Sequence, residues 1–178
     1  MIRIKENKSV EIDSSLSNPT IDLIRAHRSI RSYKPLPVPN NLIKTVSITA
    51  QSASSTCFSK TYSVMSIRAP EVKSELRRVC DGQKWVEECP VFRAFCADIN
   101  RLDDICKASG KRVNLEHTGT FLMAALDFGL FMQNAAVAAG SLGLGIVMIG
   151  GLRDSVREGI KLLDLPYGVF GISEMCIG

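Results

Sequence analysis

The chain has 178 residues, of which 46% are hydrophobic, and its formal net charge is +4 from 22 basic and 18 acidic residues. This length and composition suffice for one α/β domain with a substantial core. The basic residues are spread along the chain rather than clustered, so we expect no nucleic-acid partner.

The first part of the chain is predicted to be an arm followed by a short helix. Residues 1–17 are polar and charged without periodicity, and we expect them to form a flexible arm. Asn18 and Pro19 are an N-cap followed by proline at the first helical position, and this helix should end near His27. Prolines at alternate positions in residues 35–39 then predict an extended connector.

The middle of the chain alternates between helical and extended patterns. Apolar residues recur at helical spacing over residues 41–53, and residues 61–68 read as a strand. Pro70 begins a further helix. Residues 91–97 are apolar and predict a buried strand, in which Arg93 is an exception that the pattern does not explain.

The second half contains the longest apolar segment. A short surface helix is expected over residues 103–111 and a long helix over residues 115–142, for which Gly143 is a suitable residue after the C-terminus. A short buried strand at residues 145–150 and an amphipathic helix at residues 154–163 follow.

A last strand is predicted over residues 169–177. Strands separated by helices favour an α+β or α/β fold over an all-helical one. We therefore expect one domain over residues 18–178.

The apolar segment at residues 121–142 is long enough to span a membrane. Asp127, Gln133 and Asn134 interrupt it, however, so we expect a helix buried in a core or a subunit interface, and no membrane partner.

The six cysteines show no spacing typical of a zinc site or a redox pair. The N-terminus lacks the pattern of a signal peptide. Reduced thiols in a cytoplasmic protein are the expectation, and no metal site is predicted.

Three polar clusters stand out against the apolar background. They lie at residues 27–31, at residues 52–56, and in two glycine-rich stretches at 142–145 and 149–153. Cations, hydroxyls and free backbone N–H groups are what a phosphate-bearing cofactor needs, and glycines let the backbone approach a flat ligand.

Each cluster alone has a simpler explanation. Arg28 and Arg31 could pair with a surface carboxylate such as Asp22, and the serines could be ordinary turn formers. Gly150 and the following glycine could form only a tight turn between a strand and a helix.

Taken together and in this order, the clusters resemble the nitroreductase family. The stretches that carry the resemblance are Thr20-Ile21-Asp22-Leu23-Ile24, His27-Arg28-Ser29-Ile30-Arg31, Gly82-Gln83-Lys84, Phe95-Cys96-Ala97-Asp98, Gln133-Asn134-Ala135-Ala136, and Ser141 to Arg153. The resemblance covers about residues 20–165 and is strongest to the NADPH-dependent, oxygen-insensitive major nitroreductases and their flavin reductase relatives.

The resemblance implies an α+β fold, a three-layer α-β-α sandwich with a mixed, mainly antiparallel sheet and a long central helix. It also implies a homodimer with FMN at the interface. A long helix buried within a single subunit would explain the apolar segment equally well.

The resemblance also implies which residues bind FMN. His27, Arg28 and Ser29 would hold the phosphate and ribityl chain together with Ile30, and Arg31 would sit near the pyrimidine edge of the flavin. Gln83 would bond that same edge, and Ser55 would contact the cofactor from the other subunit. The ring would be lined by four consecutive residues: Met148, Ile149, Gly150 and Gly151.

The implied activity is transfer of hydride from NADPH or NADH, through FMN, to a nitroaromatic, a quinone or free flavin by a ping-pong mechanism. No catalytic side chain is required, because the flavin carries the chemistry. Family members of this branch continue beyond the position of Gly178, so we expect this chain to lack their C-terminal extension.

Two other hypotheses remain at the level of the sequence. The chain could be a degenerate flavin-binding module that keeps the fold but has little turnover. It could also be a structural dimeric domain without a cofactor.

Overall fold

The computed structural model describes residues 13–178. Most of the predicted arm, residues 1–12, lies outside the described residues, and the rest of it contains a 3-10 helix at Ser14–Leu16. The helices and strands that follow are, in chain order, α1 (Pro19–Ala26), α2 (Asn40–Ala50), β1 (Tyr62–Ile67), α3 (Pro70–Val79), α4 (Lys84–Glu88), β2 (Val91–Asp98), α5 (Ile99–Ala108), α6 (Thr118–Ser141), β3 (Ile146–Ile149), α7 (Gly151–Asp154), α8 (Val156–Leu162) and β4 (Val169–Ile177).

The sheet has the strand order β1-β2-β4-β3, and each neighbouring pair is antiparallel. A parallel contact is present as an isolated bridge between Ser29 and Ile146. The two central strands are the most buried: every residue of β2 is buried, and β4 contains only buried and half-buried residues. The register of β2 against β4 shifts between Phe95 and Cys96, which leaves Ile172 as the extra residue of a β-bulge.

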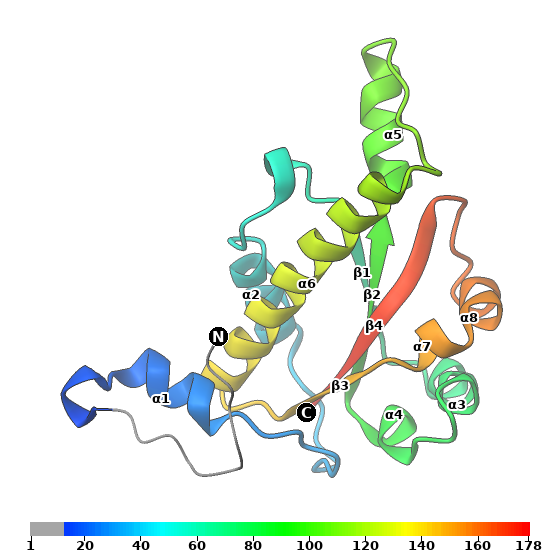
Figure 1. Cartoon of the computed structure of the whole chain (residues 1–178). Helices are drawn as coiled ribbons and strands as arrows, with labels where there is room; N and C mark the ends of the chain where they lie inside the picture. The colour runs from blue at the N-terminus through cyan, green and yellow to red at the C-terminus, as the bar shows by residue number, and fades with distance from the viewer. Residues whose placement is uncertain (1–12) are drawn as a thin grey trace, which may run out of the picture.

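Helices cover both faces of the sheet (Figure 1). On one face α2 and α6 pack against a core that includes Val46, Phe95 and Phe131. On the other face α3, α4, α7 and α8 enclose a second core that includes Leu76 and Phe92. The three-layer α+β architecture predicted from the sequence is therefore confirmed.

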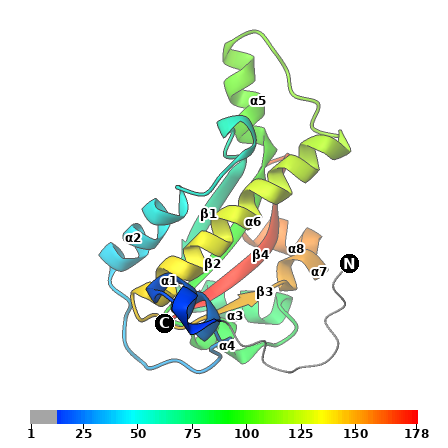
Figure 2. The ribbon, with the colours of Figure 1, turned by 60° about the vertical axis from the view of Figure 1, so that its left-hand side comes forward.

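The long helix α6 crosses one face of the sheet, with α5 near its beginning and α1 near its end (Figure 2). It begins at His117, whose Nδ1 accepts the N–H of Gly119. Its length and composition would allow it to cross a membrane, but 44% of its most apolar window is buried inside the fold. The expected burial in a core is thus met only in part within this chain.

Several predicted boundaries are wrong, for local reasons. α5 begins at Ile99 rather than 103, because the Asp98 side chain caps it by accepting the N–H of Arg101. The predicted helix at residues 154–163 is α8 alone, and α7 forms a separate turn before it. α4 was not predicted, since five residues are too short for a periodic pattern.

Arg93 remains exceptional in the structure. It is buried in β2, its guanidinium lies 5.5 Å from the centroid of the Phe95 ring, and within residues 13–178 its Nε and Nη1 atoms have no hydrogen-bond partner. Burial lowers the pKa of Arg93 to about 10. The cation–π contact with Phe95 is the interaction of the guanidinium that the described residues provide.

Candidate functional site

The segment that follows α1 presents its polar side chains on the surface. Asn18 caps α1 by accepting the N–H groups of Thr20 and Ile21, and the helix ends at His27. Arg28 folds back over this end, and its Nη1 donates to the carbonyls of Arg25 and His27 at 3.1 and 2.7 Å. These contacts fix the start of the guanidinium-rich segment, because the carbonyls of a helix C-terminus attract a cation.

The same segment runs alongside β3. Ser29 forms the parallel bridge with Ile146, and the N–H of Ile30 donates to the Ile146 carbonyl at 2.8 Å. A Cβ on Gly145 would lie 2.9 Å from the Ile30 side chain, so only glycine permits this close approach. Two of the polar clusters from the sequence are therefore adjacent in space.

Trp85 of α4 relates Arg31 to Gln83, because it contacts Arg31 and lies two residues after Gln83 in the chain. The Arg31 guanidinium lies 5.5 Å from the centroid of the Trp85 ring, a cation–π contact. Gln83 is the N-cap residue of α4, the helix that carries Trp85, and it is half-buried. Trp85 was not predicted as a site residue, because the five residues of α4 are too few to show a helical pattern.

The four predicted ring-lining residues run from the end of β3, through the turn at Gly150, to the start of α7. Met148 is exposed and Ile149 is buried. A Cβ on Gly151 would lie 2.6 Å from the Cys80 Cα, so the backbone of this turn packs directly on the end of α3. At Gly150 a Cβ would meet only the end of the flexible Arg153 side chain.

The N–H of Gly150 is one polar group that this turn leaves available. Within residues 13–178 it donates to no other group, and the residue is half-buried. A free N–H beside a glycine surface is a ready donor to a flat heteroaromatic ligand.

Ser55 lies apart from these residues within one chain. It precedes a loop that is fastened to the first half of α6, where the buried Asp127 carboxylate accepts the Thr56 N–H at 2.7 Å, the Ser59 hydroxyl at 3.1 Å, and the Thr61 N–H and hydroxyl at 3.5 and 3.3 Å. This loop lies at the α5 end of α6, whereas α1 lies at the other end (Figures 1 and 2). Three of its non-glycine residues have positive φ: Cys57, Phe58 and Lys60.

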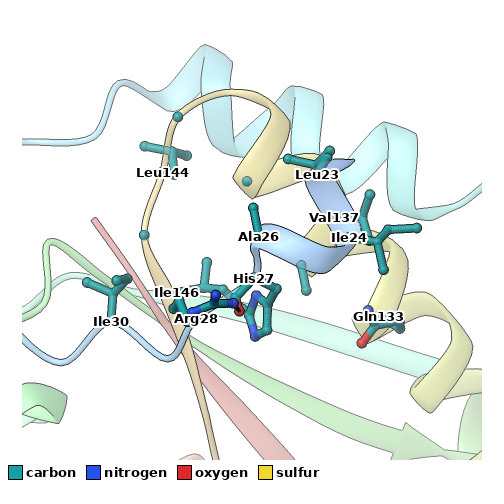
Figure 3. Close-up of a pocket in the computed structure, with 14 residues that line it drawn as sticks. Leu23, Ile24, Ala26, His27, Arg28, Ile30, Gln133, Val137, Leu144 and Ile146 are labelled. Atoms are coloured by element: carbon teal, nitrogen blue, oxygen red, sulfur yellow. Dashed lines mark hydrogen bonds between the residues drawn. The ribbon is translucent and has the colours of Figure 1, made fainter. Parts of the chain in front are cut away.

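A pocket of about 430 Å³ lies between α1, the second half of α6 and the loop that leads to β3. Figure 3 shows the side chains of His27 and Arg28 next to each other at this pocket, with Leu23 and Ile24 of α1 and Gln133 and Val137 of α6 around it. Its wall is mostly apolar, with cationic and imidazole groups on one side.

Arg28 and Arg31 have guanidinium groups that could bind an anion. Within residues 13–178 neither Arg28 nor Arg31 forms an ion pair. Asp22, the carboxylate that the sequence offered as their partner, instead accepts the Ser17 hydroxyl at 2.5 Å. The reading of these arginines as ion-paired surface residues is therefore wrong for that partner.

One carboxyl group lies behind the β3–α7 turn. Glu174 is paired with Ile149 in the sheet and is completely buried, and within the described chain neither carboxyl oxygen has a hydrogen-bond partner of good geometry. Burial raises the pKa of Glu174 to about 8, which the N–H groups of Leu152 and Gly151 offset only in part. No sequence pattern pointed to this group, since a single glutamate in an apolar strand does not reveal which face it occupies.

The pocket thus combines the Arg28 guanidinium and the His27 imidazole with an apolar wall, whereas Arg31 and the Gly150 N–H lie outside its lining. Such a set can bind an anionic group attached to a flat ring.

Comparison with known proteins agrees with this fold. A sequence model described as the nitroreductase family matches residues 24–178. The chain belongs to the nitroreductase family.

Its relatives are reductases. It is 34% identical over 163 residues to an FMN reductase (NADPH) of Bacillus subtilis, covering 90% of this chain and 66% of that protein. It is 35% identical over 161 residues to an oxygen-insensitive NADPH nitroreductase of Salmonella typhimurium, covering 90% and 65%. The chain therefore spans about two thirds of the length of the curated relatives it matches.

Solved structures show the same fold. NfrA2 of B. megaterium superposes with a TM-score of 0.88 at 36% identity, covering 91% of this chain and 66% of that one. The NADPH:FMN oxidoreductase from Vibrio harveyi complexed with NAD+ gives a TM-score of 0.85 at 35% identity, covering 90% and 68%.

Proposed function

We propose that this chain is an FMN-dependent oxidoreductase that accepts hydride from NADPH or NADH and passes it by a ping-pong mechanism to a nitroaromatic, a quinone or free flavin. The observation that carries the proposal is the bridge between Ser29 and Ile146. It holds the guanidinium segment beside the strand that leads into the glycine turn, in a chain whose relatives are named as FMN reductases and NADPH nitroreductases.

The residues present fit FMN. The N–H of Gly150, which donates to no other group within residues 13–178, provides a donor for a flat ring. The Arg28 guanidinium, which forms no ion pair within residues 13–178, suits a phosphate and its ribityl chain together with His27, Ser29 and Ile30.

Bound FMN would supply the hydride chemistry, accepting from the nicotinamide and donating to the acceptor. The side chains bind and orient. A cation at Arg31, held on Trp85 and near Gln83, would stabilise negative charge at the pyrimidine edge. Met148, Ile149 and Gly151 would complete the wall beside the ring.

The proposal includes a homodimer with FMN at its interface. The exposed side of α6 carries a row of leucines one helical turn apart, Leu122, Leu126 and Leu130, with exposed fractions of 53%, 64% and 47%. Such a row is typical of a surface that another chain covers. A second copy is also the route by which Ser55, remote within one chain, would reach the cofactor.

We place the protein in the cytoplasm and take residues 18–178 as its FMN-binding domain. Six free cysteines are in keeping with a reducing compartment.

Reconstitution with FMN tests the proposal. The protein should give a bound-flavin spectrum, and NADPH added without oxygen should bleach it. Arg28→Ala should weaken FMN binding about tenfold or more, as expected for loss of a charge-assisted contact, and should leave riboflavin binding much less affected.

Arg25→Ala is the matched control, because Arg25 is an exposed cation of the same helix end that contributes only its carbonyl. Equal loss of FMN and riboflavin affinity in Arg28→Ala would argue against a phosphate contact. Bound FMN that NADPH does not bleach would support the degenerate flavin-binding module, and failure to bind FMN at all would support a domain without cofactor.

A further inference from the structure

The carbonyl that precedes the free N–H of Gly150 is itself held by a side chain. The Ser173 hydroxyl donates to the Ile149 carbonyl at 2.6 Å. That carbonyl and the Gly150 N–H belong to the same planar peptide group, so a bond that fixes one also fixes the direction of the other.

The β-bulge in β4 puts Ser173 in this position. The extra residue Ile172 shifts the register, after which Ser173 lies opposite Phe95 and Glu174 opposite Ile149. Bulges next to functional sites commonly re-aim a side chain. A second contact joins the bulge to the segment after the turn: Arg153 Nη1 of α7 lies 3.4 Å from the Ile172 carbonyl oxygen.

The bond also has an electrostatic effect. A donor at the carbonyl oxygen polarises the peptide group, and chains of hydrogen bonds strengthen one another by about 10–30% per bond. The Ser173 hydroxyl therefore makes the Gly150 N–H a better donor as well as a better-directed one.

We propose that Ser173 is a positioning residue that orients and polarises the Ile149–Gly150 peptide, so that the Gly150 N–H is presented to the ring nitrogen of FMN that accepts hydride. This inference rests on the proposed function. The oxidised ring offers a lone pair at that nitrogen, whereas the reduced ring carries hydrogen there, so the contact favours oxidised FMN.

The test compares Ser173→Ala with Ser173→Thr, which keeps a hydroxyl. Ser47→Ala is the matched control, because the Ser47 hydroxyl donates to a backbone carbonyl, that of Ile43, at 2.8 Å in α2. Circular dichroism establishes that each variant is folded.

The first readout uses protein without FMN. Labelling glycine with ¹⁵N gives few amide signals, since the chain has 13 glycines, and Gly150→Ala identifies the one of interest. Ser173→Ala should shift the Gly150 amide signal more than those of glycines outside the turn, and Ser173→Thr and Ser47→Ala should shift it little.

The second readout is the affinity for oxidised and for reduced FMN. Ser173→Ala should weaken binding of oxidised FMN severalfold, with a smaller loss for reduced FMN and a more positive midpoint potential. An unmoved Gly150 signal, or equal losses for both redox states, would overturn the role of Ser173. Failure of the unaltered protein to bind FMN would overturn the proposed function, and the flavin role of Ser173 with it, while the amide signal would still report on the hydrogen bond.

Discussion

The buried carboxyl of Glu174 should make the stability of the protein fall as pH rises. In the unfolded chain this glutamate titrates at its ordinary pKa of 4.5, whereas in the folded protein burial raises its pKa to about 8. Between these two values the folded state holds a proton that the unfolded state has released. The free energy of unfolding therefore decreases with rising pH across this window.

The size of the effect follows from the two pKa values. Each pKa unit corresponds to about 1.4 kcal/mol, so complete ionisation above pH 8 costs roughly 5 kcal/mol, and roughly 3 kcal/mol of this is already lost at pH 7. The surroundings explain why the penalty is not offset. Asp154 adds to it by repulsion, and Arg153 relieves it only partly.

Urea unfolding of Glu174→Gln and the unaltered protein at pH 5 and pH 8 measures this effect. The amide cannot ionise, so the unaltered protein should lose roughly 3 to 4 kcal/mol more than the variant between the two pH values. A constant offset of about 1–3 kcal/mol is expected in the variant from its buried amide, and it does not affect the slope. Glu116→Gln, at an exposed position, is the control and should follow the unaltered protein. Identical pH dependence in Glu174→Gln and the unaltered protein would falsify the assignment of a buried, ionisable carboxyl behind the turn.

Two further changes test the packing around the site. Gly151→Ala should lower the free energy of unfolding by roughly 1–3 kcal/mol, since the new methyl group would lie 2.6 Å from the Cys80 backbone. Urea unfolding measures it, and a loss no larger than that of Gly129→Ala, where a Cβ meets nothing within 4 Å, would contradict the close packing. Arg93→Leu should raise stability by about 1–4 kcal/mol, because it removes a buried cation whose Nε and Nη1 atoms have no hydrogen-bond partner within residues 13–178. A destabilised Arg93→Leu protein in the same assay would show that the guanidinium has a partner outside the described residues.

The local signals in the sequence were sufficient for most elements of the fold. Asn18 and Pro19 start α1, and Gly143, with φ of +75°, follows the end of α6. The strands and the long helix were found from their apolar patterns, because side-chain burial imposes periods of about two and 3.6 residues. Short elements such as α4 and α7 escaped, since four or five residues do not establish a period.

For the candidate site, the sequence supplied the residue types and their order, and the resemblance supplied the family. The contacts between segments far apart in the chain were decided by the tertiary structure: Arg31 on Trp85, Ser29 beside Ile146, and the separation of Ser55 from both. These depend on strand register and helix docking, which are set by the packing of the whole core.

What the sequence determined by itself is one domain of alternating strands and helices, with polar clusters whose order resembles the nitroreductase family. What only the tertiary structure decided is how the β3–α7 turn is supported. The bulge at Ile172 places the Ser173 hydroxyl on the Ile149 carbonyl. It also leaves the next side chain, that of Glu174, completely buried. A one-residue change of register reverses the face on which every later side chain lies, and nothing local in the sequence marks where that change occurs.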